Sequence, residues 1–185
     1  MSPVSNVLIG YWHRLPTEPC AVRRANLAVA CRDVRSGALP KAALTVFALG
    51  DVDDEVVVTA THAYVECAAS PAAGEQAAAV DDVLEWIRRG LALNGGAIFS
   101  ALLELDDPAI VERLAALRLG LRTQDLETVC RRFKSKPTTA VEGFLEDWTQ
   151  LVDASADLHL RRQHAILSIA LDGHDTNRRQ NRAVA

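Results

Sequence analysis

Apolar positions along this chain recur with the 3.6-residue period of an α-helix, and glycine, proline or acidic residues separate the periodic segments. The clearest stripe is formed by Val141, Phe144, Leu145, Trp148, Leu151 and Val152. The same spacing predicts helices over 4–14, 18–34, 39–49, 53–69, 76–93, 95–105, 107–119, 122–133, 137–153 and 156–171. We therefore predict an all-α protein.

The segment 53–69 is ambiguous, because the run Val56-Val57-Val58-Thr59 has strong strand propensity. One helical face would nevertheless carry Val56, Val57, Ala60, Tyr64 and Ala68, and the other Glu55, Thr59, His62 and Glu66. Either Asp53 or Asp54 can cap the helix N-terminus. The periodicity spans more residues than the strand-like run, so we predict a helix.

Glycines and prolines mark the predicted boundaries. Gly37, Gly50, Gly74, Gly95-Gly96 and Gly120 fall between segments, where helix ends often need a left-handed residue. Pro19, Pro108 and Pro137 are expected just inside helix starts. Residues 69–74 are the clearest predicted loop. The last residues lack apolar periodicity, which predicts one helical domain over 1–172 and a disordered tail over 173–185.

Three acidic pairs, Asp53-Asp54, Asp81-Asp82 and Asp106-Asp107, are the first candidates for chemistry. Pairs of carboxylates can serve acid/base catalysis or bind cations. All three are assigned to helix starts, however, where a carboxylate accepts from free backbone N–H groups and suits the helix dipole. We interpret them as N-caps that also line one acidic edge.

Composition and length are those of an ordinary globular domain: 185 residues, 49% hydrophobic and 24% charged. No apolar run approaches the ~20 residues that a membrane helix needs, and the first residues do not resemble a signal peptide. Cys20, Cys31, Cys67 and Cys130 are scattered, which favours reduced thiols. These features predict a cytoplasmic protein without a membrane partner.

Charge is unevenly distributed along the chain. Residues 1–42 carry a net +4, residues 43–112 a net −11, and residues 113–185 a net +3. Duplex DNA requires a basic footprint, so the acidic middle argues against it as the main partner. A partner protein with a basic face would suit this distribution better.

A short apolar helix, an acidic turn and a second helix recur along the chain. The segments "TEPCAVRRANLAVA", "ALGDVDDEVVVTATHAYV" and "LELDDPAIVERLAAL" align with one another. Markers at residues 18, 54, 82, 107 and 136 are separated by 36, 28, 25 and 29 residues. Intervals of this size are typical of two-helix repeats.

These segments resemble the HEAT repeat, a helical-repeat family of the armadillo type, in their Asp/Pro turn, hydrophobic pair and Ala-rich second helix. Arg23 or Arg24 and Arg113 match its basic position, whereas Thr59-Ala60 departs from it. The resemblance covers mainly 17–65 and 95–120. It implies a right-handed α-α superhelix of about 4–5 irregular pairs, and a role in binding proteins along the second helices.

The predicted function is therefore a non-catalytic protein–protein interaction module: an adaptor, chaperone or assembly factor. We expect the partner to contact the polar face of the second helices. That face is assigned to Arg23, Arg24, Glu55, Thr59, His62, Glu66, Glu112, Arg113, Glu142, Glu146 and Thr149. The aromatic run Tyr11-Trp12-His13 is a further possible anchor, although it is better suited to capping the first apolar face.

Motifs for a cofactor, a metal or a covalent intermediate are not found in the sequence. Neither HExxH, zinc-type Cys/His spacing, a phosphate loop nor GxSxG occurs. His159 and His164 are five residues apart and point in different directions, and His164 is expected in the core. The basic cluster from Arg131 to Lys136 is interpreted as a solvated helix end.

Two alternatives stay open. Some HEAT-like proteins resemble bilin lyases, which implies a Cys-dependent lyase or ligand-handling protein in which Cys20 or Cys31 is activated by Arg23, Arg24 and Arg32. The second alternative is a plain helical bundle that closes around one core instead of stacking as a superhelix.

Overall fold

The computed structural model describes residues 17–67, 73–153 and 157–184, and side chains within these ranges except 73–75 and 174–184. Every regular element in the described residues is a helix, which confirms the predicted all-α class. The predicted helix 4–14, the aromatic run at 11–13 and most of the predicted loop 69–74 lie outside the described residues.

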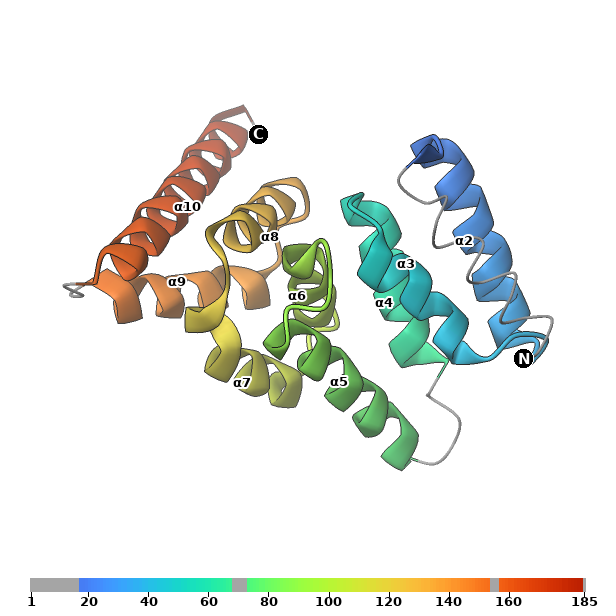
Figure 1. Ribbon diagram of the computed structural model, residues 1–185. Helices are drawn as coiled ribbons and strands as arrows, with labels where there is room; N and C mark the ends of the chain where they lie inside the picture. Colours follow the sequence, from blue (N-terminus) through green and yellow to red (C-terminus); the bar gives the residue numbers. More distant parts are fainter. Residues whose placement is uncertain (1–16, 68–72, 154–156, 185) are drawn as a thin grey trace. The chain divides into compact units, whose positions relative to one another are not determined.

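The chain divides into two compact units, residues 1–102 and 103–185. The elements of unit 1 are α2 (Cys20–Arg35), η2 (Lys41–Leu44), α3 (Thr45–Gly50), α4 (Asp54–Glu66), α5 (Ala73–Arg88) and α6 (Gly95–Leu103), the last of which ends at the boundary (Figure 1). The elements of unit 2 are α7 (Pro108–Leu117), η3 (Arg118–Gly120), α8 (Thr123–Ser135), α9 (Thr139–Asp153) and α10 (Leu158–Val184).

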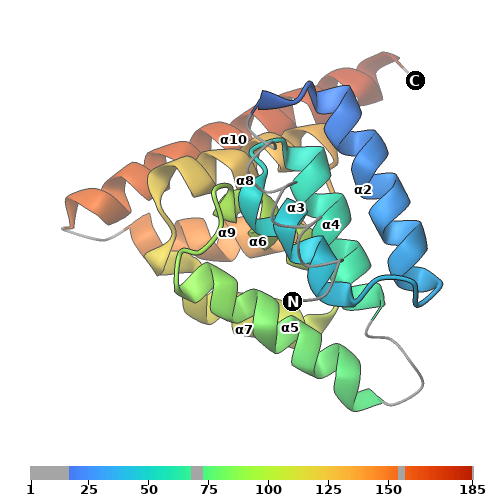
Figure 2. The ribbon, with the colours of Figure 1, turned by 45° about the vertical axis from the view of Figure 1, so that its right-hand side comes forward.

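The helix α4 forms the centre of unit 1 and packs against α2, α3 and α5 (Figure 2). Val56, Val57 and Val58 are all buried, because neighbouring helices cover more than one side of α4. Burying three consecutive valines stabilises the helix by more than their preference for strands disfavours it. The prediction that this segment is a helix is confirmed for Asp54–Glu66, with the N-cap at Asp53, and the predicted end at 68–69 lies outside the described residues.

The core of unit 2 lies where α10 packs against α8 and α9. Trp148 is fully buried, and its indole N–H donates to the amide oxygen of Gln163 at 3.2 Å. The amide nitrogen of Gln163 donates to the backbone oxygen of Leu121 at 3.4 Å. Both the oxygen and the nitrogen of the Gln163 amide therefore have a hydrogen-bond partner, which makes it favourable to bury this polar side chain in the core. The expected core residue, His164, is instead one-third exposed and lies 3.0 Å from Asp153.

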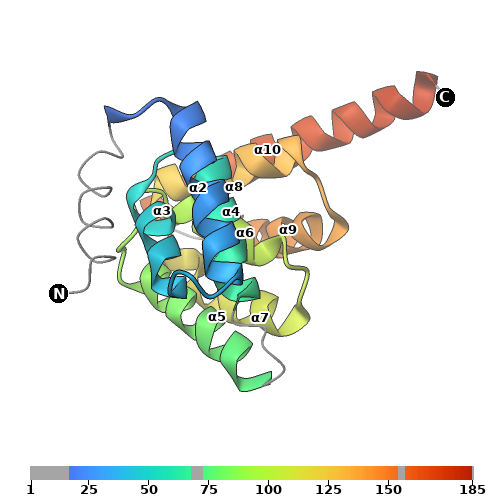
Figure 3. The ribbon, with the colours of Figure 1, turned by 90° about the vertical axis from the view of Figure 1, so that its right-hand side faces the viewer.

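Several predicted boundaries differ from the structure. The helix α10 continues to Val184, beyond the predicted end at 171, and extends past α9 in Figure 3. The helix α5 stops at Arg88 rather than 93, because Gly90 adopts a left-handed φ of 60°. Pro19 is the N-cap of α2 rather than a residue inside it.

The assignment of Asp81-Asp82 to a helix start is wrong, because both residues lie inside α5. The side chain of Asp82 accepts a 2.7 Å hydrogen bond from the hydroxyl of Tyr64 on α4. This bond joins two neighbouring helices of unit 1. Among the described residues, no helix has the length and apolar character needed to cross a membrane.

Candidate protein-interaction surfaces

A polar network joins the start of α2 to the start of α4 in unit 1. Arg23 donates from Nε to Asp51 at 2.7 Å and from a terminal nitrogen to the backbone oxygen of Glu18 at 2.6 Å. Asp51 also accepts from the backbone N–H of Asp53 at 2.9 Å. Arg24 donates to both carboxylate oxygens of Asp53 at 3.1 Å. Two carboxylates of the acidic turn, those of Asp51 and Asp53, are therefore each paired with an arginine of α2.

The thiol of Cys20 is part of this network, and its environment opposes activation. Its Sγ lies 3.1 Å from Asp53 Oδ2. The hydrogen bond to Asp53, burial and the charge of Asp53 raise the pKa of Cys20 and outweigh the lowering effect of Arg24 and Arg23. The pKa of the Cys31 thiol is also raised, mainly because this side chain is buried. Both thiols are thus held protonated at neutral pH, which does not favour nucleophilic chemistry.

The predicted second-helix surface falls partly in unit 1. Thr59 and Glu66 are exposed on α4, and Glu66 lies 3.3 Å from Arg35 on α2. Glu55 is half-buried on the first turn of the same helix. His62 is drawn inward, because its Nε2 lies 2.8 Å from the backbone oxygen of Ala101.

Arg23 and Arg24 differ in how much they offer to a partner. The Arg23 side chain is 12% exposed and holds the buried carboxylate of Asp51. The Arg24 side chain is largely exposed even while it contacts Asp53. Internal contacts thus occupy Arg23 and His62, and the outward part of the surface in unit 1 consists of Arg24, Glu55, Thr59 and Glu66.

The remaining predicted residues lie in unit 2, on two different helices. Glu112 and Arg113 are exposed on α7. On α9, Glu146 is exposed, Glu142 is half-buried, and the hydroxyl of Thr149 donates to the backbone oxygen of Leu145 at 2.8 Å. The predicted residues therefore form separate sets in the two units.

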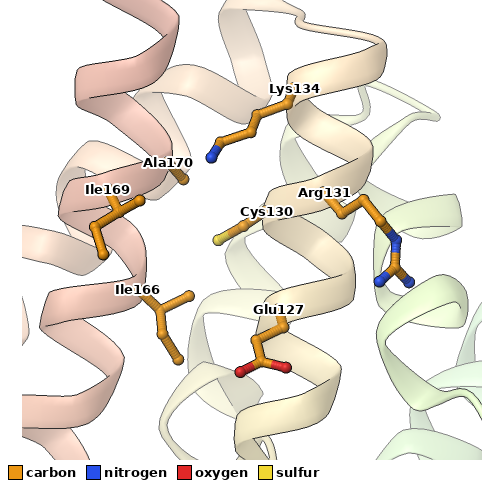
Figure 4. A pocket seen from close by; sticks show the side chains of 7 residues that line it. All are labelled: Glu127, Cys130, Arg131, Lys134, Ile166, Ile169 and Ala170. Carbon is orange, nitrogen blue, oxygen red and sulfur yellow. The ribbon is translucent and has the colours of Figure 1, made fainter.

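An open groove lies between α8 and α10 of unit 2, and sequence reasoning missed it (Figure 4). It has a volume of about 380 Å³ and is lined by Glu127, Cys130, Arg131, Lys134, Ile166, Ile169 and Ala170. Ile169 is 66% exposed, whereas Cys130 and Ala170 are buried at the floor. Burial raises the pKa of the Cys130 thiol to about 12, so the floor is uncharged.

The rim of this groove carries opposite charges. In Figure 4 the side chains of Lys134 and Glu127 lie on the groove side of α8, while Arg131 points away from α10. Arg131 instead contacts the hydroxyl of Thr128 at 3.0 Å. The sequence signal for this groove is the apolar pair Ile166 and Ile169, which lies outside the stripe of Leu160, Leu167 and Leu171.

The described residues contain no group of three or more His, Cys, Asp or Glu side chains that could hold a metal ion. Comparison of the chain with protein-family models, with curated proteins and with solved structures found no match. The interpretation of the two surfaces consequently depends on their own geometry.

Proposed function

We propose that this chain is a non-catalytic, cytoplasmic protein–protein interaction module that acts as an adaptor, chaperone or assembly factor. The observation that carries the proposal is a local motif that occurs twice along the chain: an apolar helix, an acidic turn and a capped second helix. The first copy runs from α3 through Asp53 to α4 within unit 1, and the second runs from α6 at the end of unit 1 through Asp107 to α7 at the start of unit 2.

An aspartate side chain caps the second helix at both turns. The side chain of Asp53 accepts from the N–H of Val56 at 3.1 Å, and that of Asp107 accepts from the N–H of Ala109 at 2.9 Å. Each turn therefore starts a helix at a fixed point after a buried one. We propose that these motifs belong to a HEAT-like right-handed superhelix of about four or five pairs.

A basic partner fits the exposed acidic groups on the second helices. Glu66, Glu112 and Glu146 are all exposed and lie on α4, α7 and α9. The segment 43–112 carries a net charge of −11, which steers basic proteins toward it. In unit 1, Arg24 and Thr59 would contribute further polar contacts to a partner bound at α4.

Charge reversal on α4 tests the assignment. The variant E55K/E66K changes two outward positions of the second helix and should lower partner capture at physiological salt by about tenfold or more. Capture is measured by affinity purification with quantitative mass spectrometry, using the full chain as bait. Circular dichroism should show unchanged helical content.

The matched control is D81K/E85K, which makes the same change in net charge at one exposed and one half-buried position of α5, as E55K/E66K does on α4. Proteins retained by the wild-type chain and the control, but lost with E55K/E66K, support the surface. Equal losses with both variants would indicate a nonspecific electrostatic effect. Unchanged capture with E55K/E66K would show that the surface assignment is wrong.

A further inference from the structure

The groove between α8 and α10 leaves apolar surface uncovered in the described residues. Ile169 is 66% exposed, and Ile166 beside it is half-buried, above a floor that includes Cys130. Exposed apolar side chains of this size that converge on one depression mark an interaction site more often than scattered ones do. An occupant that brings an apolar side chain would cover this surface.

The charges on the rim identify the chemistry of that occupant. Glu127 and Lys134 are both exposed, line the groove and form no ion pair among the described residues. They are seven residues apart on one helix, hence two turns or about 10 Å along its axis. The rim is therefore acidic at one end and basic at the other.

Two copies of this rim are complementary in charge when they lie antiparallel to each other. An antiparallel copy of α8 places each Glu127 opposite the Lys134 of the other copy, as an isologous two-fold interface requires. A strongly acidic or strongly basic partner would satisfy one end of the rim and repel the other. The charge pattern thus favours a second copy of this chain over an unrelated charged protein.

We propose that the α8/α10 groove is a self-association site that pairs two copies of this chain about a two-fold axis. The axis passes between Glu127 and Lys134 of α8. Each Ile169 packs against the apolar lining of the opposite groove and excludes water from it. Two Glu127–Lys134 pairs, one at each end, set the antiparallel register.

The decisive experiment uses two single charge reversals and their mixture. Wild-type protein, E127K and K134E are each examined by sedimentation equilibrium from about 1 to 500 µM, a range that covers weak and moderate dimers. The wild-type chain should dimerise. Each single variant should have a dissociation constant about tenfold or more higher, because like charges then face each other at both ends.

Mixing the two variants should restore association. A copy with lysine at both rim positions meets a copy with glutamate at both, so all four charges are complementary. The mixed dimer should have a dissociation constant within about threefold of the wild-type value. An unrelated docking site on α8 would not predict this recovery.

Two further variants complete the test. I169D should abolish dimerisation by placing a carboxylate in the apolar groove, and D147K at an exposed position of α9 should leave it unchanged. The proposal is overturned if the wild-type chain is monomeric at 500 µM, or if the E127K and K134E mixture associates no better than either variant alone. Neither outcome bears on partner capture by the acidic surface of α4, so the two proposals fail separately.

Discussion

Each compact unit contains a buried ion pair between an arginine and a carboxylate 28 residues away, but the buried partner differs. In unit 1 the carboxylate of Asp51 is 1% exposed, whereas its partner Arg23 is 12% exposed. In unit 2 the guanidinium of Arg132 is 4% exposed, whereas its partner Glu104 is 19% exposed.

This difference determines which member of each pair is the dependent one, that is, the buried charge whose loss of its partner destabilises the fold most. A charge that loses its partner is tolerated when it can reach water, and it is costly when it cannot. Asp51 is therefore the dependent member in unit 1, and Arg132 is the dependent member in unit 2. Two pairs of the same chemical type should then respond in opposite ways to removal of the acid and removal of the base.

The largest effect is expected from R23M in unit 1. The methionine retains the aliphatic stem but leaves the Asp51 carboxylate buried beside a single backbone donor, the N–H of Asp53. We expect a loss of about 3–5 kcal/mol in the free energy of opening unit 1. D51N, which leaves Arg23 able to reach solvent, should cost about 1–3 kcal/mol. Native-state hydrogen exchange of the α2 and α4 amides measures both.

An exposed pair on the same two helices provides the control. Arg35 and Glu66 are each more than half exposed and lie 3.3 Å apart. R35M should change the stability of unit 1 by no more than about 1 kcal/mol. Equal losses for R23M and D51N would show that burial of the individual partner does not determine the cost.

The order should reverse in unit 2, with a somewhat smaller effect. Glu104 accepts from Nε of Arg132 at 2.9 Å and from a terminal nitrogen at 2.7 Å. E104Q removes the negative charge that these buried donors contact and should lower the stability by about 3 kcal/mol. The loss is expected to be no larger, because the amide oxygen of glutamine can still accept hydrogen bonds from Arg132. R132M should cost about 1–2 kcal/mol, because Glu104 can turn to solvent.

Hydrogen exchange of the α8 amides reports these two variants without interference from unit 1. A larger loss for R132M than for E104Q would contradict the assignment of Arg132 as the dependent member. Unchanged exchange in both would show that the pair is not coupled to the opening of α8.

Neither pair was predictable from the sequence, although most helices were. Helical periodicity is a local property, so the positions of α4 and α9 follow from the chain itself. A contact across 28 residues depends on how helices pack, which periodicity does not specify. The repeat alignment led to a specific error at Asp81-Asp82, because a pair of aspartates inside α5 resembles the pair that caps α4.

The candidate surfaces show the same division between local and long-range information. The outward positions of α4 followed from helical spacing, so Thr59 and Glu66 are exposed as expected. Spacing could not reveal that His62 turns inward to the backbone oxygen of Ala101, a residue on another helix. The α8/α10 groove was missed for a related reason: its two walls are helices that are not consecutive in the chain, because α9 lies between them.

The smallest effect is expected at Asp53, in the same turn as Asp51. Asp53 is less buried than Asp51, so its contribution to stability comes from hydrogen bonding rather than from burial. Burial acts to raise the pKa of Asp53, but hydrogen bonds from the Cys20 thiol, the Val56 N–H and Arg24 outweigh it and lower the pKa below the ordinary 3.8. A carboxyl whose pKa is lowered on folding stabilises the fold above its unfolded pKa. That contribution is lost as the pH falls through the lower, folded value.

We therefore compare wild-type protein with D53N, since asparagine caps a helix about as well as aspartate but does not titrate. Above pH 5 the wild type should be more stable by about 1 kcal/mol, because its charged carboxylate binds Arg24 and the helix N-terminus. The advantage should shrink below pH 3.8 and vanish once Asp53 is protonated in the folded state. Urea unfolding at a series of pH values between 3 and 6 measures this difference, and parallel stability curves for the two proteins would contradict it.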